Sequence, residues 1–283
     1  MLSSDKAAKW ILAAPLLLFF LLMVLFPTGY AIYLSVHNVS LGQETPDFSG
    51  LANYLDILKD RDFWHSIGFT LKFALTVTAV ELVFGFLLAL LFNRAFPGKR
   101  ILLSTVLLPI MVAPSLMGIM FRLILNENNG VATYFLSRLG LEVNLFDPDI
   151  VVRLLMILDV IQWVPFTFLI LYSGLQSVDR GLSEAAAVDG ASYWRTTLQI
   201  ILPVIAPIFF IAAFLRGIDA FRTFDVIYVL TNGGPGNVSK TASIYIYETA
   251  FKSGNIGTAA ASSVIIALIL LMLIPFFIRR LGK

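Results

Sequence analysis

Apolar residues fall into six long runs along the chain, and short polar or charged stretches separate them. Each run holds about 20 or more residues, enough for a helix to cross about 30 Å of hydrocarbon. The runs are continuous rather than alternating, which argues against a membrane-spanning β-barrel. The pattern therefore predicts an all-α integral membrane protein with six transmembrane helices, at Trp10–Ser35, Ile67–Phe92, Ile101–Leu125, Ile150–Tyr172, Leu202–Leu230 and Ile256–Ile278.

Composition supports lipid as the surrounding solvent. Of the 283 residues, 58% are hydrophobic and 13% are charged, and the mean hydropathy is +0.87, unlike a soluble globular domain. The chain has no cysteine, which excludes disulfides and thiolate chemistry. His37 and His65 lack the spacing of metal ligands, so we expect no metal site. A net charge of +2 is too small to suggest nucleic-acid binding.

Lysine and arginine favour one side of the predicted spans, and by the positive-inside rule that side is cytoplasmic. The residues that flank spans there are Lys6, Lys9, Arg94, Lys99, Arg100, Arg180, Arg195, Arg279, Arg280 and Lys283. The opposite loops also hold basic residues, so the asymmetry is modest. We expect a bacterial inner-membrane protein with both termini in the cytoplasm and with residues 36–66 as a periplasmic loop.

Prolines interrupt several predicted spans. Pro109 and Pro114 fall in the third, Pro165 in the fourth, and Pro203 with Pro207 in the fifth. Each removes a backbone hydrogen bond, and in lipid the freed carbonyls must face protein or a wet cavity. Broken helices are common where transporters bind or gate, but ordinary packing kinks are an equal alternative.

The segment 183–203, between the fourth and fifth spans, predicts two short helices on the cytoplasmic surface. Ser183 and Ser192 can each cap a helix, Glu184 lies at the positive end of the first, and Gly190 permits a sharp turn between the two. Such a hairpin could dock into a groove of a partner, or could simply join two spans along the interface.

The same segment carries Glu184-Ala185-Ala186, then Gly190, then Ile200-Ile201-Leu202-Pro203, a pattern that resembles the EAA signature of ABC-importer permeases. A second stretch, Phe221–Gly236, ends in Thr-Asn-Gly-Gly-Pro-Gly and resembles carbohydrate-uptake permeases of the maltose and glycerol-3-phosphate type. The resemblance covers nearly the whole chain. It implies one permease domain over 1–283, with the fold of type I ABC importers but without the extra N-terminal spans and large outer domain of the maltose subunit.

The resemblance also implies partners. These are a second homologous permease, two copies of a cytoplasmic ATPase, and a periplasmic or lipoprotein sugar-binding protein. The EAA loop would be the coupling helix that docks on the ATPase, through Glu184, Ala185, Asp189 and Gly190. ATP and Mg would bind to the ATPase, because this chain has no Gly-x-x-x-x-Gly-Lys-Ser/Thr loop and Gly234–Thr241 has the wrong spacing for one. We expect no cofactor and no enzymatic activity in this chain.

Polar residues inside the spans are the candidate cargo contacts, because they are costly in lipid unless they face a cavity or one another. Asp159, Gln162, Trp163 and Phe166 have i, i+3, i+4, i+7 spacing and share one helical face, where they offer the carboxylate, amide and aromatic groups that suit a sugar. The resemblance adds Gly118 in the third span, and Phe221 with Arg222 in the fifth.

Three arginines, Arg122, Arg216 and Arg222, lie toward the outer half of their spans and would suit an anionic sugar derivative. Structural pairing is the alternative, since Arg222 is three residues from both Asp219 and Asp225. Glu81 and Lys72, in the second span, are expected to pair or to reach the interface rather than to bind cargo.

Other functions fit some of these features. An ion-coupled secondary sugar transporter could use Asp159, Asp219 or Glu81 as a proton or sodium site, but it leaves the EAA pattern unexplained. A permease-like receptor would bind the ATPase without transporting sugar. A membrane enzyme has the least support, because the sequence shows neither a nucleophile with a base nor metal-ligand spacing.

Overall fold

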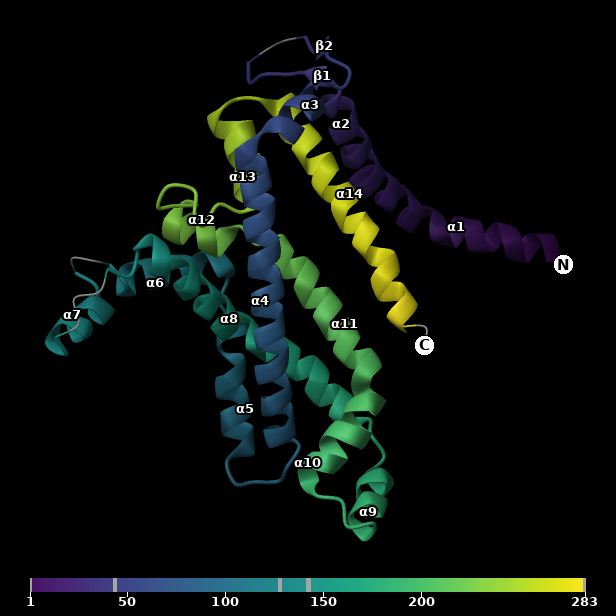
Figure 1. Ribbon diagram of the computed structural model, residues 1–283. Coiled ribbons are helices and arrows are strands. Elements are labelled where there is room, and N and C mark those ends of the chain that lie inside the picture. The colour runs from purple at the N-terminus through teal and green to yellow at the C-terminus, as the bar shows by residue number, and fades with distance from the viewer. Residues whose placement is uncertain (1, 43–44, 127–128, 141–143, 282–283) are drawn as a thin grey trace. The chain divides into compact units, whose positions relative to one another are not determined.

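The computed structural model describes residues 2–42, 45–126, 129–140 and 144–281, and it describes the backbone alone for residues 2–8, 180 and 273–281 (Figure 1). Nearly all regular structure in these residues is helical. The chain divides into two compact units. The first comprises residues up to Phe63 together with Tyr245–Met272, and the second comprises Trp64–Ile244 and the last residues of the chain.

The first unit begins with a long apolar helix. It consists of α1 (Leu2–Phe20), a π-helical turn (Leu21–Leu25) and α2 (Phe26–Ser35). Its apolar stretch, Lys9–Ser35, is 27 residues long, and of these residues only Ser35, at its end, is buried within the chain. A helix that is apolar all round and has no covering partner belongs in lipid or against another protein.

A small polar cap follows in the same unit. The strands β1 (His37–Asn38) and β2 (Asp47–Phe48) pair antiparallel and precede α3 (Ala52–Lys59). The buried Asn53 ties the cap together, because its Nδ2 donates to the carbonyls of Ser35, at 3.0 Å, and of His37, at 2.9 Å. The Tyr245 hydroxyl donates to Asp60 at 2.5 Å. Burial and the Asp60 carboxylate both raise the pKa of Tyr245, which keeps this donor protonated.

The second unit is a helical bundle. Its elements are most of α4 (Arg61–Phe92), α5 (Lys99–Leu107), a 3-10 turn (Pro109–Met111), α6 (Pro114–Ile124), α7 (Val131–Arg138), α8 (Pro148–Gln176), α9 (Arg180–Val188), α10 (Tyr193–Thr196), a π-helical turn (Thr197–Ile201), α11 (Leu202–Phe221), α12 (Asp225–Thr231) and the start of α13 (Ala242–Tyr247). The last helix, α14 (Ile256–Leu281), begins in the first unit.

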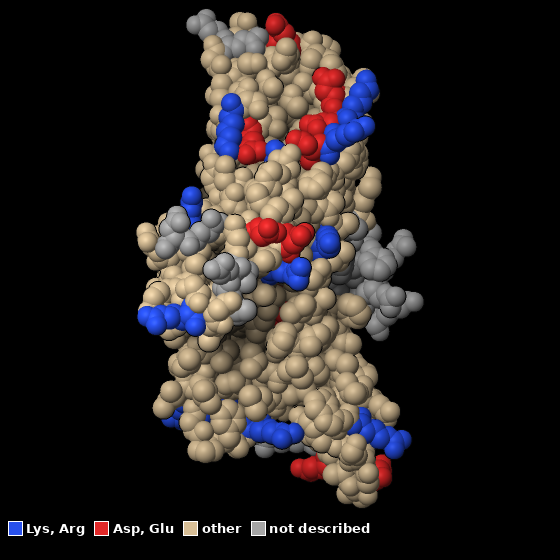
Figure 2. Space-filling view, turned by 60° about the vertical axis from the view of Figure 1, so that its left-hand side comes forward, with Lys and Arg blue, Asp and Glu red and all other residues tan. Residues whose placement is uncertain are grey.

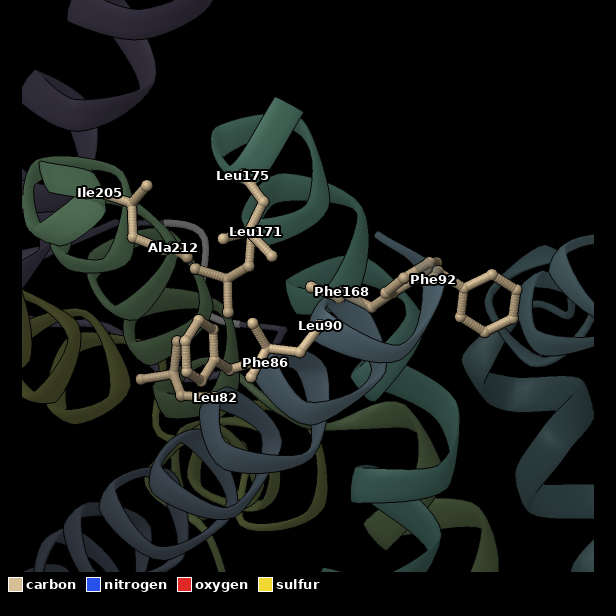
Figure 3. Close-up of a cluster of buried hydrophobic side chains, with 10 residues drawn as sticks. Leu82, Phe86, Leu90, Phe92, Phe168, Leu171, Leu175, Ile205 and Ala212 are labelled. Carbon is tan, nitrogen blue, oxygen red and sulfur yellow. The ribbon is translucent and has the colours of Figure 1, made fainter. Parts of the chain in front are cut away.

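Helices α4, α8 and α11 pack around one apolar core in the second unit. Figure 3 shows this core, which holds Leu82, Phe86, Ala89, Leu90, Phe92, Phe168, Leu171, Leu175, Ile205 and Ala212. Helix packing in lipid depends on close contact, which small residues allow. Gly85 provides it, because a Cβ there would lie only 2.5 Å from Thr167 Oγ1 and 2.9 Å from the backbone nitrogen of Phe168. The Thr167 hydroxyl also donates to the carbonyl of Glu81 at 3.0 Å.

The predicted spans coincide with helices, with two corrections. The third, Ile101–Leu125, is not straight: its halves, Lys99–Met111 and Pro114–Ile124, meet at 94°. Pro109 and Pro114 remove the hydrogen bonds that would keep this stretch straight. The fifth, Leu202–Leu230, breaks after Phe221, and α12 begins at Asp225.

Within the described residues, four helices are long and apolar enough to cross a membrane, or five if the bent pair forms one span. Helix α14 adds an apolar stretch over Ile256–Met272. Figure 2 shows charged side chains in its upper and middle parts and again at its lower end, where Figure 1 places α9 and α10, and uncharged surface lies directly above that lower group. This pattern is that of an integral membrane protein.

Candidate functional site

Three charged side chains from three helices meet inside the second unit. Arg216 on α11 lies between Glu81 on α4 and Asp159 on α8, and the exposed fractions of these side chains are 1%, 0% and 4%. Arg216 Nε lies 2.6 Å from Glu81 Oε2, and Arg216 Nη2 donates to Glu81 Oε1 at 2.9 Å. Nη2 also donates to Asp159 Oδ2. We call these residues, together with Asp219, the charge cluster.

Asp219 is the outermost member of the charge cluster. It lies one turn after Arg216 on α11, and its Oδ2 accepts from Arg216 Nη1 at 3.2 Å. Its side chain is 51% exposed, unlike the other three. The planar guanidinium suits this arrangement, because its nitrogens point in fixed directions toward separate carboxylates.

Burial makes the pairing of Arg216 with Glu81 and Asp159 necessary for the fold. A lone charge in the hydrocarbon region is costly, and the removal of one partner from a buried pair typically costs about 3–5 kcal/mol. The structure therefore confirms the expected pairing of Glu81. It shows as well that Arg216 neutralises buried acids rather than facing a cargo. It also leaves the ion-coupled alternative without a free carboxylate, since Asp159, Asp219 and Glu81 all pair with Arg216.

A small pocket adjoins the charge cluster. It has a volume of about 280 Å³ and is lined by Trp163, Phe166, Leu215, Ile218, Asp219 and Arg222. The rings of Trp163 and Phe166 meet edge to face, with 6.2 Å between their centroids. The Arg216 guanidinium lies over the Trp163 ring, 5.0 Å from its centroid. Asp219 thus belongs to both the charge cluster and this pocket, which we call the aromatic pocket, and Trp163 contacts the cluster through Arg216.

The predicted polar face of α8 is observed, but two of its residues line the pocket and the other two bond to groups on other elements. Trp163 and Phe166 line the aromatic pocket, whereas Asp159 is 3% exposed and is held by Arg216. Gln162 is 1% exposed, and its Nε2 donates to the carbonyl of Val112 at 3.0 Å. That carbonyl lies at the bend of the third span, so Gln162 satisfies a backbone group that the bend frees.

Three other predicted cargo contacts occupy packing positions. A Cβ on the buried Gly118 would lie 3.1 Å from Val229 Cβ, so Gly118 serves the close contact of α6 with α12. Arg122 Nη1 donates to the carbonyl of Val229 at 3.1 Å. Phe221 is 5% exposed at the end of α11. None of these three residues lines the aromatic pocket.

The three arginines do not form one cationic site. Arg216 is surrounded by carboxylates, and Arg122 bonds a backbone carbonyl, which leaves Arg222 as the arginine that lines the pocket. The alternative, structural pairing, applies to Asp219 with a different partner from the one that spacing suggested, because Asp219 pairs with Arg216 rather than with Arg222. Sequence spacing allowed either choice, and the buried position of Arg216 decides it.

The EAA segment folds as the predicted helical hairpin. Helix α9 is capped by Asp179, whose Oδ1 accepts from the Gly181 nitrogen at 2.9 Å, and not by Ser183 as expected. Gly190 turns the chain with φ +74°. Ser192 caps α10, as predicted, by accepting from the Arg195 nitrogen.

The hairpin presents a continuous exposed surface. Glu184, Ala185, Asp189 and Gly190 are all exposed, and Val188 is 88% exposed at the end of α9. In contrast, Ala186 is 5% exposed, and its carbonyl accepts from the nitrogen of Ala191 at 2.9 Å. The small side chains fix the fold of the hairpin while the charged ones remain available to a partner.

Two long helices connect the hairpin to the charge cluster. Helix α8, with Asp159, ends at Gln176 just before α9. Helix α10 continues through the π-helical turn into α11, which carries Arg216. The α4–α5 loop braces both ends: Gln176 Nε2 donates to Asn93 Oδ1 at 2.8 Å, and Arg94 lies 4.3 Å from the Tyr193 ring centroid. The hairpin is therefore joined directly to the two helices that carry Asp159 and Arg216.

The pairing of Arg216 with Glu81 and Asp159 was not predicted from the sequence. The signal was present, because charges of opposite sign interrupt three separate apolar runs, at Glu81, Asp159 and Arg216. Such charges in hydrocarbon usually pair with one another. No spacing rule assigns the partners, since 57 and 135 residues separate Arg216 from the two acids.

Comparisons with known proteins agree with this architecture. A probable ABC transporter permease protein, y4oQ, from Sinorhizobium fredii is 38% identical over 93% of this chain and 86% of its own length. The trehalose/maltose transport system permease MalF from Thermococcus litoralis is 35% identical over 90% of this chain and 87% of its own. The trehalose permease SugA from Mycobacterium tuberculosis is 33% identical over 99% and 90%.

A solved structure has the same fold. A bacterial ABC transporter involved in the import of the acidic polysaccharide alginate superposes with a TM-score of 0.81 at 23% identity, covering 100% of this chain and 99% of that one. Residues 81–281 match the family described as binding-protein-dependent transport system inner membrane component. The chain therefore belongs to this family, as a permease subunit of the ABC-importer type.

Proposed function

We propose that this chain is the translocation subunit of an ATP-driven importer that carries a sugar or sugar derivative across the inner membrane. The relatives named above support the cargo class, since two of them are permeases for trehalose or maltose. One observation of the structure supports the coupling: an exposed EAA hairpin continues into α8 and α11, which carry Asp159 and Arg216 and line the aromatic pocket.

The mechanism follows from that connection. A loaded sugar-binding protein docks on the periplasmic side, and a pair of ATPase subunits closes on ATP and Mg in the cytoplasm. Glu184, Ala185, Asp189 and Gly190 contact the ATPase, and the hairpin passes its motion to α8 and α11. A second permease subunit completes the passage, and both termini of this chain lie in the cytoplasm. Hydrolysis belongs to the ATPase.

The aromatic pocket supplies the cargo contacts of this chain. Aromatic faces pack against the C–H surface of a sugar ring, while Asp219 accepts from hydroxyl groups and Arg222 donates to oxygens. Asp159 and Gln162 support the pocket indirectly. Asp159 holds Arg216, and Gln162 bonds the carbonyl of Val112 at the bend of the third span.

Purification in mild detergent from the native host tests this function. Mass spectrometry should identify a second permease and an ATPase that co-elute with this chain, and deletion of its gene should abolish uptake of one sugar. A homo-oligomer that takes up sugar without ATP, under conditions that preserve assembled importers, would contradict it.

A further inference from the structure

A row of aromatic rings runs along one face of α2 and onto the small sheet of the first unit. The members on and just after the helix have i, i+4, i+7, i+11 spacing, which places them on one helical face: Phe26, Tyr30, Tyr33 and His37. Their successive ring centroids lie 6.3, 6.2 and 4.1 Å apart. Phe48 lies opposite His37 in the β1–β2 pair, with an edge-to-face contact at 5.5 Å. We call these five residues the aromatic ladder.

The aromatic ladder is open along its length. All its members except His37 are exposed, and Phe48 is 77% exposed. The ring of His37 is fixed in the middle of the row, because its Nδ1 donates to the carbonyl of Tyr33 at 2.7 Å. Exposed aromatic surface of this extent marks contact with lipid or with another protein.

The faces of the helix outside the ladder favour lipid. Leu17, Leu21 and Val24 lie on the face opposite Phe26, and they are exposed too. A docked protein covers one face of a helix, whereas lipid surrounds a span on all sides. A helix that is apolar and open on both faces is therefore a lipid-exposed span, and the ladder is part of its lipid surface.

The length of the helix places the membrane boundary within the ladder. About 20 residues at about 1.5 Å each cross the hydrocarbon layer of about 30 Å. Trp10 follows the charged Lys9, as expected at one membrane interface, and Tyr30 is 20 residues further along. Tyr33 and His37 then lie beyond the hydrocarbon, in the layer of phospholipid headgroups.

The chemistry of the rings changes at the same place. Phe26, on the hydrocarbon side, has no polar atom in its ring, whereas Tyr30 and Tyr33 carry hydroxyls and His37 carries ring nitrogens. Tyrosine suits a membrane–water interface, because its ring is apolar and its hydroxyl finds a polar partner there. Length and chemistry thus agree on the position of the boundary.

We propose that the aromatic ladder is a phospholipid-binding surface: Tyr30, Tyr33 and His37 lie in the headgroup layer at the end of the span away from Lys9, and Phe48 contacts the same layer. This contact holds the β1–β2 pair against the membrane and sets the height of the polar cap above the hydrocarbon. The inference concerns the membrane contact of the first unit and does not depend on the cargo.

Photo-crosslinking in membranes of the native host tests the inference, because it reports what touches a chosen side chain in the assembled complex. The probe is benzoylphenylalanine in place of Phe48 or of Tyr33, both of which are exposed, so the fold is preserved. Phe20, exposed halfway between Trp10 and Tyr30, is the control for the hydrocarbon. Asp56, an exposed acid on α3 of the same unit, is the matched control for water.

Mass spectrometry of the irradiated chain should find one phospholipid joined to the probe at Phe48, at Tyr33 and at Phe20, and none at Asp56. Fragmentation should locate the bond on the headgroup or glycerol at Phe48 and Tyr33, and on an acyl chain at Phe20. Acyl bonds at Phe48 and Tyr33 would overturn the placement of the boundary.

Other outcomes overturn the lipid contact itself. A second permease or another protein joined at Phe48 and Tyr33 in place of lipid would make the ladder a protein interface. An unmodified probe at Phe48, with lipid joined at Phe20, would place Phe48 in water. Equal lipid attachment at Phe48 and Asp56 would show that the ladder contacts lipid no more than the charged surface does. None of these results bears on the proposed import of sugar.

Discussion

Arg216 and Glu81 contact each other twice, at 2.6 and 2.9 Å, although 135 residues separate them in the chain. This pair joins α11 to α4 where neither side chain meets solvent. The pair restricts the axial position of α11 relative to α4 more than apolar packing alone does. An apolar contact tolerates sliding of one helix along the other, whereas two directed bonds from a guanidinium do not.

Arg216→Met should destabilise the protein by about 3–5 kcal/mol, because it leaves Glu81 and Asp159 buried without a cation. The free energy of unfolding can be measured by titrating SDS into mixed micelles. Arg222→Met is the control: Arg222 is exposed, and its replacement should change that free energy by no more than about 0.5 kcal/mol. If the two variants lowered the free energy of unfolding equally, the stabilising role of Arg216 would be contradicted.

Gly85→Ala should lower the free energy of unfolding by about 1–3 kcal/mol through overpacking. The new methyl group would meet Thr167 Oγ1 at 2.5 Å and the Phe168 nitrogen at 2.9 Å. Gly68→Ala, in the same helix, is the control, because nothing lies within 4 Å of its Cβ position. Thr167→Ala should restore only part of the loss, since the backbone clash remains.

Glu184→Lys should abolish uptake and the recovery of the ATPase, while membrane insertion is unchanged. The charge reversal falls on the exposed face of α9, which is proposed to meet that subunit. Co-purification measures the interaction directly. Asp56→Lys is the control, because it reverses the charge of an exposed residue on α3, which is distant in sequence from the hairpin. This variant should leave ATPase recovery intact. Wild-type transport in Glu184→Lys would remove the coupling role of the hairpin.

Trp163→Ala should reduce the initial rate of sugar uptake by at least about ten-fold, without loss of the assembled complex. It removes one wall of the pocket and the ring that lies 5.0 Å from Arg216; a contribution of about 1.4 kcal/mol corresponds to a ten-fold effect. Leu169→Ala, also on α8 but 40% exposed, should have little effect. Asp159→Ala should weaken uptake too, through Arg216. Full activity of Trp163→Ala would place the cargo elsewhere.

Local periodicity predicted much of this structure. The spacing of Asp159 and Trp163 placed both side chains on one face, and both contact Arg216. The hairpin around Gly190 also followed from local signals, because a glycine with positive φ and a serine cap act within a few residues. The family resemblance carried the function, since the EAA pattern concerns a partner that the periodicity does not reveal.

Other features depended on contacts that the sequence does not encode locally. The third span contains two prolines, but a proline predicts a kink and not the angle of that kink. The angle here is 94°, and Gln162, from another span, donates to the carbonyl of Val112 at the bend. The break after Phe221 has no proline or glycine to mark it, and the apolar pattern continues into α12. The cap of α9 had two polar candidates, of which Asp179 prevailed over Ser183.

The distance along the chain between Glu81 and Arg216 also sets an order of events during biosynthesis. The ribosome adds about 5–20 residues per second, so the guanidinium is made on the order of ten seconds after the carboxylate that it neutralises. During that delay α4 must enter the bilayer with its acid uncompensated, at a cost of about 2.5–3.5 kcal/mol. The strongly apolar character of the rest of α4 offsets this cost. A nascent chain that stops before α11 leaves the two acids, Glu81 and Asp159, for the insertion machinery to shelter.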